Sequence, residues 1–532
     1  MNSLFIIIVS IAAFSWAYKV YARKLERIFQ VNPLDAVPSK TKYDGVDYVP
    51  AKNWLVLFGH HFASIAGAGP IVGPVIACCI WGWGPALILV IFGSIFLGAV
   101  HDFGALVISV KEGGKSISSV ALTVISKRAY IMFALFVWLT LILVIAVFVY
   151  LCADTFVKEP RIVLPSIGII PLAILVGFLL YNLKVNQVLA TLIGILGLVV
   201  LIILGQFFLI TAVSFSGWVI ILLIYCFLAS ILPVNILLQP RDYLCSFLLI
   251  FGLVVGLLGL FISHPVIQSP AFISFNSSEG NLWPMLFVII ACGAISGFHS
   301  LISSGTTSKQ IANERDARKI GYGAMIIEAV VAVMAILVVA GGLGKACLVD
   351  KSGPVVIFSK GYNVVTKNIL FGYGGVFAIL LLNAFILTSL DTATRITRYL
   401  MEELFKIKHR YISAFMAVAL GGWLALAKDS LNEPMWKRLW PAFGASNQLV
   451  AALALFVISC WLLSRNKSAK VTLYPAIFML VTTVAALVYQ VVTNFKNGHY
   501  SLFAISLILI VLAFIMTIDV IKVFKKKRIS SK

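Results

Sequence analysis

The sequence predicts an all-α polytopic membrane protein with about fifteen transmembrane helices, and three observations support this fold class. Of its 532 residues, 61% are hydrophobic and only 11% are charged, so lipid must cover much of the apolar surface. The apolar residues are gathered in segments long enough to span a bilayer. These segments show no alternation of apolar and polar residues with a period of two, which favours helices over barrel strands.

The predicted spans follow one another along the chain. Their approximate ranges are 3–22, 55–80, 84–110, 130–152, 162–181, 187–213, 216–237, 243–263, 282–304, 320–342, 368–390, 411–427, 440–464, 470–493 and 500–521. The longest connections, at 23–54 and 343–367, contain proline, glycine and charged residues, as loops do. The first span lacks a preceding basic region and a small-residue cleavage site, so we expect an uncleaved helix rather than a signal peptide.

Membrane topology explains the net charge of +21 better than nucleic-acid binding does, so no nucleic-acid partner is expected. With the N-terminus outside and the spans alternating, about three-quarters of the 41 Lys and Arg residues fall on the inner side. This bias predicts a C-terminus in the cytoplasm. The basic tail KVFKKKRISSK at 522–532 is then expected to rest against the anionic lipid of the bilayer.

Glycine and proline interrupt two predicted spans. One reads GHHFASIAGAGPIVGP at 59–74, and the other reads YCFLASILPVNILLQPRDY at 225–243 with Pro233 in its middle. Such breaks in matching positions of two inverted repeats mark the binding site of many transporters. Because the two spans lie five apart, they predict a five-plus-five inverted repeat. We therefore expect a peripheral helix and cytoplasmic loop at 1–54, a first repeat at 55–213, a second inverted repeat at 214–392, and peripheral helices with a basic tail at 393–532.

The first break predicts a binding segment. Pro70 removes a backbone donor, and Gly67 and Gly69 permit unwinding, so free amides and carbonyls can bind a carboxylate and a cation respectively. Tight packing of small residues against another helix is the alternative explanation. His60 and His61 precede the break by about two turns and can relay protons. Because adjacent side chains point about 100° apart, we expect only one of the two to face a pathway.

Other titratable residues lie within later spans. His101 and Asp102 are in the span 84–110, and Glu328 is in the span 320–342. A carboxyl group in a bilayer is costly unless it is paired or protonated, so both acids are candidates for proton uptake. A fixed ion pair between two helices is the alternative for Asp102.

The segment IACGAISGFHSLISSGTTSK at 290–309 carries a polar stripe. Ser296, His299, Ser300, Ser303 and Thr307 recur at spacings of three and four residues and share one helix face. Hydroxyl groups suit sodium, whereas His299 suits a proton. Hydrogen bonds from these hydroxyls to their own helix are the alternative.

Residues of opposite charge are predicted near the inner ends of two spans. Arg241 and Asp242 follow one interrupted span, and Asp391 precedes Arg395 by one helical turn. Each pair can serve as a gate or as an ordinary interfacial salt bridge.

Catalytic motifs are missing from the sequence. It contains no Walker A, HExxH or GxSxG pattern, and its eight cysteines lack metal-ligand spacing. We therefore expect no enzymatic activity, no cofactor and no metal. A nutrient sensor on a transporter fold, an intramembrane metal or redox enzyme using the histidines, and a channel are the alternatives to a transporter.

Six strings resemble, in order, those of the carbon starvation protein A (CstA) family. They are FGHHFASIAGAGPIVGP, GAVHDFGAL, SILPVNILLQPRDYL, IACGAISGFHSLISSGTTSKQ, LDTATRITRY and WPAFGASNQLVAALAL, and the resemblance covers about residues 30 to 455. It implies a bacterial inner-membrane transporter linked to peptide uptake and to pyruvate–proton symport during carbon limitation. It also implies a leucine-transporter-like fold, in which the first helix of each repeat is broken and binds substrate.

The resemblance implies roles for the candidate residues. It implies substrate binding by His61, Ser64, Gly67, Ala68, Gly69, Pro70, Leu232, Pro233 and Asn235. It implies a cation site at Ser303, Ser304, Thr306 and Thr307. The titratable residues His60, His101, Asp102, His299 and Glu328 join them as candidates for cation or proton coupling, and Arg241, Asp242, Asp391 and Arg395 remain gate or salt-bridge residues. The expected function is secondary active import of a small carbon source, pyruvate or short peptides, by symport with H⁺ or Na⁺. The substrate carboxylate is expected on the amides around 64–69, with 232–235 closing the other side.

Overall fold

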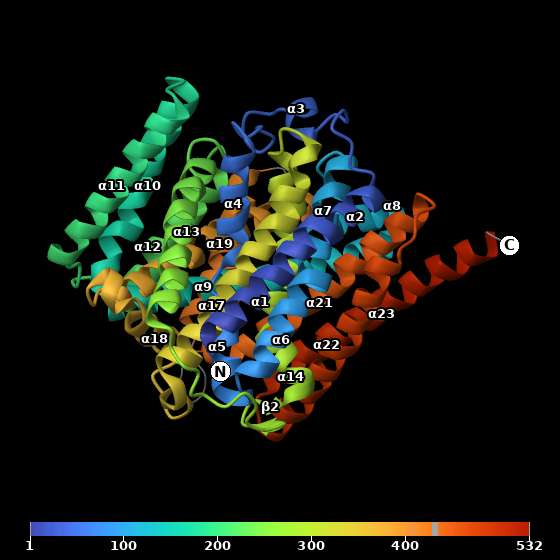
Figure 1. Ribbon diagram of the computed structural model, residues 1–532. Coiled ribbons are helices and arrows are strands. Elements are labelled where there is room, and N and C mark those ends of the chain that lie inside the picture. The colour runs from blue at the N-terminus through green and yellow to red at the C-terminus, as the bar shows by residue number, and fades with distance from the viewer. Residues whose placement is uncertain (1, 408, 428–434, 531–532) are drawn as a thin grey trace.

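The computed structural model describes residues 2–407, 409–427 and 435–530, and within them the fold is helical apart from one small hairpin (Figure 1). Twelve helical segments of the described residues are long and apolar enough to cross a membrane. The chain is therefore a multi-pass membrane protein, and the predicted all-α class is confirmed.

The predicted number of about fifteen spans is not confirmed. Two of the predicted spans are shorter helices, α12 (Phe215–Ile231) and α20 (Arg410–Leu426). A third, 282–304, is divided into α14 (Leu282–Ile289), α15 (Ala291–Ala294) and α16 (Gly297–Gly305). Apolar content finds such segments, but their length and continuity depend on the helices packed around them.

The bounds of the other elements are as follows. The first half contains α1 (Ser3–Trp16), α2 (Ala22–Phe29), α3 (Pro38–Thr41), α4 (Trp54–Ala66), α5 (Gly69–Trp81), α6 (Trp83–Gly93), α7 (Ala99–Lys111), α8 (Ile117–Val124), α9 (Lys127–Lys158), α10 (Val163–Gly177), α11 (Gln187–Phe207) and α13 (Leu238–Ser263). The second half contains β1 (Asn276–Ser277), β2 (Gly280–Asn281), α17 (Gly323–Gly342), α18 (Pro354–Leu370), α19 (Gly374–Phe405), α21 (Met435–Ser464), α22 (Lys470–Lys496) and α23 (Tyr500–Ser530).

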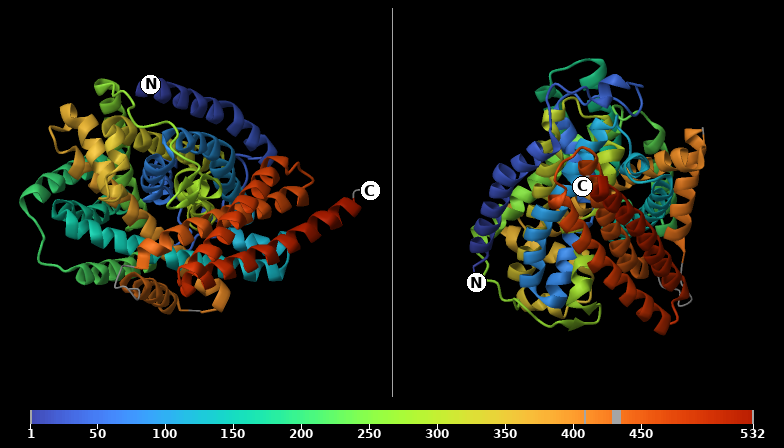
Figure 2. Two further views of the ribbon diagram at one scale, coloured as in Figure 1. Left: turned by 90° about the horizontal axis from the view of Figure 1, so that it is seen from below. Right: turned by 90° about the vertical axis from the view of Figure 1, so that its right-hand side faces the viewer.

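The core of the bundle forms around α4 and α5. Helix α13 packs along α4, α17 along α5, α16 along α7, and α9 along both α19 and α20. The hairpin of α10 and α11 lies at one side of the bundle, and α22 and α23 lie toward the opposite side (Figures 1 and 2). Of the predicted lipid-bound tail 522–532, α23 includes the residues up to Ser530, and 531 and 532 lie outside the described residues.

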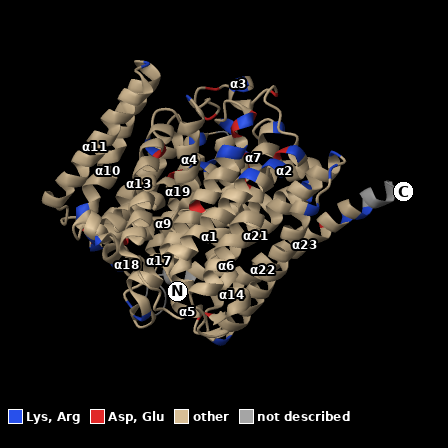
Figure 3. Ribbon diagram, in the orientation of Figure 1, with Lys and Arg blue, Asp and Glu red and all other residues tan. Residues whose placement is uncertain are grey.

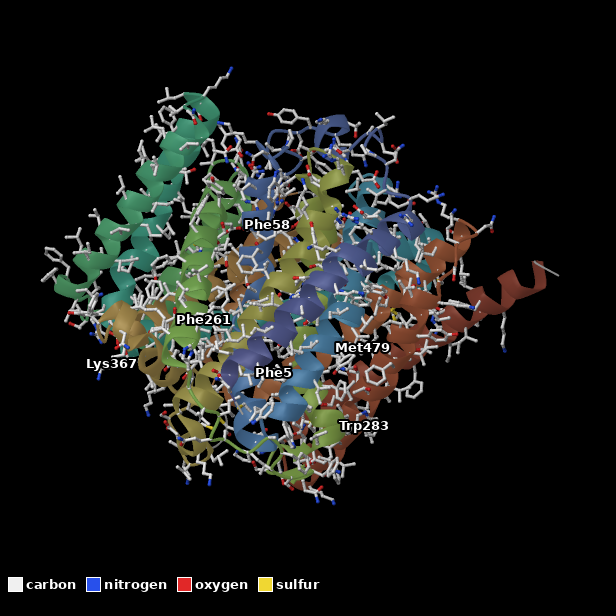
Figure 4. All side chains as sticks on the ribbon, viewed as in Figure 1. Phe5, Phe58, Phe261, Trp283, Lys367 and Met479 are labelled. Atoms are coloured by element: carbon white, nitrogen blue, oxygen red, sulfur yellow. The ribbon has the colours of Figure 1, made fainter. Side chains whose placement is uncertain are left out.

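The outer helices present apolar side chains to their surroundings, as a bilayer requires. Phe5 of α1 and Phe261 of α13 are 62% and 58% exposed, and both are labelled in Figure 4. Large exposed apolar residues also recur along α11 and α23. A water-soluble protein would not leave such helices uncovered.

Charged residues distinguish the two ends of the bundle. Lys and Arg gather around α3 and the neighbouring ends of α2 and α7 (Figure 3). We call this end, formed by the connection 30–53, α3, α8 and residues 306–319, the basic end. The opposite end carries α18 and the β1–β2 hairpin, and we call it the α18 end (Figure 1).

The predicted break in the first interrupted span is present in the structure. Helix α4 ends at Ala66, and Gly67 takes φ +49° and ψ −156° before α5 begins at Gly69. A positive φ suits glycine because any side chain there is strained. The chain continues across the bundle in two half-helices, as the Gly and Pro content predicts.

The prediction that Pro233 interrupts the second span is wrong. Helix α12 ends at Ile231 and α13 begins at Leu238, so Pro233 lies in a connection between two separate helices. Leu232 takes the extended conformation, which proline favours in the residue before it. In this sequence Pro233 therefore ends a helix instead of interrupting one.

The divided span that packs on α4 and α5 is the one made of α14, α15 and α16. A Cβ atom at Gly69 would lie 1.9 Å from the Cβ of Cys292, and one at Gly73 would lie 2.4 Å from the carbonyl oxygen of Ile289. Both explanations offered for the glycines therefore apply. Gly67 allows the break in the span, and Gly69 and Gly73 let two backbones approach closely.

Candidate functional site

Hydroxyl groups of α19 satisfy the carbonyl end of the break. Thr388 donates to the carbonyl oxygen of Ala63 at 2.5 Å, and Ser389 donates to that of Ser64 at 2.7 Å. The last carbonyls of a helix need such partners, because no further turn supplies amide groups. Sequence reasoning missed these two residues, although the buried run LTSLDT places several hydroxyls on one helix.

One group of titratable residues lies between α4, α7, α16 and α17. We call it the His299 cluster, and it consists of His61, Asp102, His299, Ser303 and Glu328, all buried. Asp102 receives a hydrogen bond from Ser303 and lies 3.2 Å from Nε2 of His61. His299 lies between two acids: its Nδ1 is 3.9 Å from Asp102, and its Nε2 is 3.2 Å from Glu328.

Glu328 is the least satisfied acid of the His299 cluster. Neither of its carboxyl oxygens has a hydrogen-bond partner among the described residues, and His299 is within ion-pair distance without hydrogen-bond geometry. A buried carboxylate without partners is costly, so the site favours a protonated, neutral carboxyl group. No cationic Lys or Arg of the described residues forms an ion pair with this cluster, so its charge is set by protons.

The other residues predicted for cation coupling divide into two groups. Thr307 joins the site, because its hydroxyl lies 2.8 Å from Nδ1 of His61. Ser304 and Thr306 instead donate to carbonyls four residues earlier, which was the alternative explanation for the stripe. His101 is next to His299, with ring centroids 6.2 Å apart, but its Nε2 contacts the carbonyl at the joint between α15 and α16.

A second group of charges lies on the other side of α4. We call it the Arg241 cluster, and it consists of His60, Ser64, Tyr225, Arg241, Asp242 and Asp391. Arg241 donates to Asp391, which also receives a hydrogen bond from Tyr225. Asp242 lies 3.8 Å from Arg241 and 2.6 Å from Nδ1 of His60. In this cluster each carboxylate therefore has a partner that can be cationic.

The two histidines of α4 contact different clusters. His60 contacts Asp242 of α13, and His61 contacts Asp102 of α7. Both side chains are fully buried. The expectation that only one of them faces a pathway stays a prediction, but each histidine contacts a titratable group on a different neighbouring helix. Helix α4 therefore links the two clusters.

Two details of the predicted gate residues differ in the structure. Arg241 and Asp242 are buried rather than at a surface, because they belong to the first turns of α13. Asp391 pairs with Arg241 instead of Arg395, and Arg395 pairs with Asp47 at 2.8 Å. The long side chain of Arg395 reaches past the end of α12, where it meets the connection that carries Asp47.

Residues 232–235 lie at the basic end. The carbonyl oxygen of Leu232 accepts a hydrogen bond from Arg395 at 2.5 Å, and the amide of Val234 donates to Val46 at 3.0 Å. The backbone carbonyl of Asn235 lies against Gly177 of α10. Among the described residues, these contacts associate 232–235 with the connection 44–49 and α10 rather than with the break at 67–69.

A cavity of about 490 Å³ opens at the α18 end and reaches toward the break. Val72 of α5 and Trp440 of α21 are among its lining residues. Trp440 packs edge-on against Phe443 at 5.6 Å, and Phe443 packs against Phe148 at 6.1 Å. The ring of Phe148 would be 3.3 Å from a Cβ atom at Gly67. These three aromatic rings therefore extend from the cavity to the break.

Metal binding finds no support among the described residues. They contain no group of three or more His, Cys, Asp or Glu side chains that could hold a metal ion, and none of their eight cysteines forms a disulfide.

Comparisons with known proteins agree with this arrangement. A family model described as "Carbon starvation protein CstA" matches residues 2–343 and 339–486. The chain is 31% identical to the pyruvate/proton symporter BtsT of Escherichia coli (strain K12), over 92% of this chain and 81% of the relative. It is also 31% identical to the peptide transporter CstA of Bacillus subtilis (strain 168), over 98% of this chain and 97% of the relative.

Solved structures show a similar fold. The manganese transporter of Eremococcus coleocola, in complex with an aromatic bis-isothiourea substituted compound, superposes with a TM-score of 0.54 at 13% identity. The match covers 90% of this chain and 99% of the transporter. At such low identity the likeness concerns the fold alone. The curated relatives, in contrast, are similar in sequence along almost the whole chain, and they are named as transporters rather than enzymes. This chain therefore belongs to the carbon starvation protein CstA family of membrane transporters.

Proposed function

We propose that the chain imports a small carboxylate, pyruvate or a short peptide, across the bacterial inner membrane by symport with H⁺, in cells limited for carbon. The observation that carries the proposal is the position of His299 between two buried acids, Asp102 and Glu328. This group lies beside the break between α4 and α5. The names of the relatives support both substrate classes, and one of them is named for proton symport.

Protons account for the coupling better than sodium does. Sodium requires several free oxygen atoms, and the carbonyls of Ala63 and Ser64 at the break already accept hydroxyl hydrogens. The His299 cluster, in contrast, offers carboxyl and imidazole groups that change charge with protonation. We therefore assign the coupling ion as H⁺.

The orientation follows from the positive-inside rule. We propose that the basic end faces the cytoplasm, with the N-terminus outside and the C-terminus inside. Figure 3 supports this orientation, because Lys and Arg gather at that end. The cavity at the α18 end then opens to the outside, where substrate enters.

The two halves of the site belong to two inverted repeats in this proposal. The divided spans at 54–81 and 282–305 cross the bundle in opposite directions and pack on each other. A short helix follows the second span of each repeat, α8 in one and α18 in the other. We propose repeats at 54–263 and 282–464, in place of 55–213 and 214–392, with α10 and α11 as an added hairpin.

The substrate carboxylate is proposed to bind at the start of α5, around 67–69. The first turn of a helix presents amide groups that need partners, together with partial positive charge. Ser64 of the adjoining half-helix belongs to the Arg241 cluster, where it is 2.9 Å from Thr392 and 3.3 Å from Asp242. Ser64 thus connects the half-helix before the break to the cluster that contains the Arg241 guanidinium.

Proton binding loosens α4 in this mechanism. His61 and His60 each attach α4 to an acid on a neighbouring helix. When a proton neutralises Asp102, directly or by transfer from Glu328 through His299, the attraction between Asp102 and His61 weakens. Helix α4 can then tilt with the bound substrate, which exposes the break to the other side of the membrane.

The test is uptake of labelled pyruvate and of a labelled dipeptide into proteoliposomes with imposed pH or sodium gradients. We expect accumulation driven by an inward proton gradient and unchanged by sodium. Uptake of equal size without any gradient would contradict symport, and accumulation driven by sodium alone would contradict the choice of ion.

A further inference from the structure

We propose that the basic end holds a second carboxylate-binding site, which Asp47 occupies when the pathway is closed there and which a departing substrate carboxylate occupies when it opens. This site is formed by Arg395, Arg398, Tyr399 and Lys309. The inference rests on the proposed function for the direction of transport and the chemical class of the substrate.

Asp47 is bound as a carboxylate ligand would be. Its Oδ1 is 2.8 Å from Nη1 of Arg395 and receives a hydrogen bond from Tyr399 at 2.7 Å. Its Oδ2 is 3.1 Å from Nη2 of Arg398. Both arginine side chains are at least 98% buried, so water supplies little of their solvation. Guanidinium groups with a phenol hydroxyl are well suited to a carboxylate.

The site carries more positive charge than Asp47 neutralises. Lys309 is buried and forms no ion pair among the described residues, with its ammonium 3.7 Å from the ring of Tyr399 and 5.4 Å from that of Tyr48. The Nε atoms of Arg395 and Arg398 are buried without hydrogen-bond partners. Glu402 pairs with Arg398 at 2.9 Å. Glu403, whose charge also acts on Lys309, accepts from the hydroxyls of Ser116 and Ser119 and forms no ion pair with Lys309. An incoming anion would find unsatisfied donors there.

The positive charge of the site changes the pKa of Asp47. Burial alone would raise the pKa of Asp47, but Arg398 and Arg395 outweigh burial and lower the pKa to about 2. Burial lowers the pKa of the Lys309 ammonium, and the Asp47 carboxylate opposes that change. Asp47 is therefore ionised at neutral pH and occupies the site as a tethered anion.

The segment that carries Asp47 is shaped for this role and is connected to α4. The carboxylate of Asp44 accepts hydrogen bonds from the amides of 46, 47 and 48 at 2.8–2.9 Å, which fixes a tight turn. Six residues after Asp47, Asn53 caps α4 by accepting from the amides of 55 and 56. A tilt of α4 therefore pulls directly on the turn that holds Asp47.

Closure of the basic end by Asp47 and release of the substrate carboxylate therefore use the same site and exclude each other. While Asp47 binds the arginines, it closes the route between α12, α19 and the connection 44–49. When α4 tilts, Asp47 leaves, and the exposed cations attract the carboxylate of the departing substrate. Release to the cytoplasm follows when Asp47 returns and competes with it.

Transport kinetics from each side of the membrane test this competition. In inside-out membrane vesicles, we expect Asp47→Asn to lower the half-saturating pyruvate concentration about tenfold, because the tethered competitor is gone. In right-side-out vesicles we expect it to change less than about twofold. Arg395→Gln should raise the value in inside-out vesicles. The matched control is Asp35→Asn, which removes an exposed acid from the same connection, where it pairs with Lys111 at 3.0 Å. Equal values for Asp47→Asn and Asp35→Asn in both vesicle types would overturn the proposal.

A second measurement does not depend on transport. In hydrogen–deuterium exchange on the purified full chain, sodium pyruvate at the same ionic strength as sodium chloride should increase exchange at amides 46–48. Arg395→Gln should show high exchange in both salts, whereas Asp35→Asn should behave as the wild type. No difference between the two salts in the wild type would overturn the carboxylate site even if transport is measured successfully. If pyruvate changes exchange but no vesicle transports it, the proposed function fails and the binding site stands.

Discussion

The two clusters on either side of α4 contain similar numbers of acids but differ in their permanent charge. In the Arg241 cluster, a buried guanidinium contacts Asp391, and His60 contacts Asp242. In the His299 cluster, the ion-pair and hydrogen-bond partners of Asp102 and Glu328 among the described residues are histidines and a hydroxyl. One cluster therefore keeps a cation at every pH, whereas the charge of the other is set by the protons that it binds.

This difference suits the clusters to different roles. A permanent buried cation can hold an anionic substrate or lock two helices, but it cannot report the proton gradient. Acids without a permanent cation bind a proton readily when burial penalises their charge. Both clusters contact α4, so a change in either is transmitted to the same broken span. The predictions below test whether the two roles are separable.

Glu328→Gln is expected to have the largest effect on transport. A permanently neutral amide keeps the size of the side chain but cannot exchange a proton. We expect proton-driven accumulation to fall at least a hundredfold, whereas exchange of labelled for unlabelled substrate at equal pH should remain within about threefold. The measurement compares both assays in the same proteoliposomes.

The control for Glu328→Gln is Glu279→Gln, which alters an exposed acid beside the β1–β2 hairpin and should leave both assays unchanged. If Glu328→Gln lost exchange and accumulation equally, Glu328 would serve in binding or folding, and the separation of the two clusters would fail.

Asp391→Asn is expected to have the largest effect on stability. It leaves the buried Arg241 without its main anion, which costs about 3–5 kcal/mol. The double variant Arg241→Met with Asp391→Asn removes the stranded charge and should recover most of the thermal stability, but not uptake. The measurement is thermal unfolding in detergent beside proteoliposome uptake. Recovery of uptake in the double variant would show that the cation serves the structure alone.

Gly69→Ala is expected to have an intermediate effect through packing. Its added Cβ atom would lie 1.9 Å from that of Cys292, so α5 and α15 must separate, at a cost of about 1–3 kcal/mol. Combining it with Cys292→Gly removes the clash and should restore stability. Gly375→Ala in α19, whose nearest neighbour would be 3.5 Å away, is the matched control. A stable Gly69→Ala single variant would show that the half-helices are not packed as tightly as described.

Local sequence signals predicted part of this architecture well. The break at Gly67 was predictable because glycine and proline act on the backbone where they occur. Pro233 was misleading because proline has the same local effect on the backbone whether it ends a helix or interrupts one. The divided span 282–305 was not predicted as broken, because its joints depend on contacts with α5 and α7 that its own residues do not reveal.

The candidate site shows a similar limit. The buried acids and histidines could be predicted individually, because titratable residues are rare in apolar spans. Their partners could not. Arg395 meets Asp47 across 348 positions of sequence, and Arg241 meets Asp391 across 150. Helical spacing favoured a pair between Asp391 and Arg395 on one helix, whereas tertiary packing supplied each of them with a different partner.

The smallest expected effect concerns pH and the site of Asp47. The pKa of Asp47 lies near 2, below its ordinary value of 3.8, so its ion pairs stabilise the fold fully above about pH 4. This stabilisation is lost only as the pH falls toward 2. Between pH 5 and 8 the carboxylate stays ionised against Arg395, Arg398 and Lys309. Asp47→Asn should therefore change the rate of transport without changing the shape of its pH profile in that range, whereas Glu328→Gln should flatten the profile. The measurement is uptake at stepwise pH under a constant membrane potential. A flattened profile for Asp47→Asn would mean that the proton acts at the basic end, and the assignment of proton coupling to the His299 cluster would have to be given up.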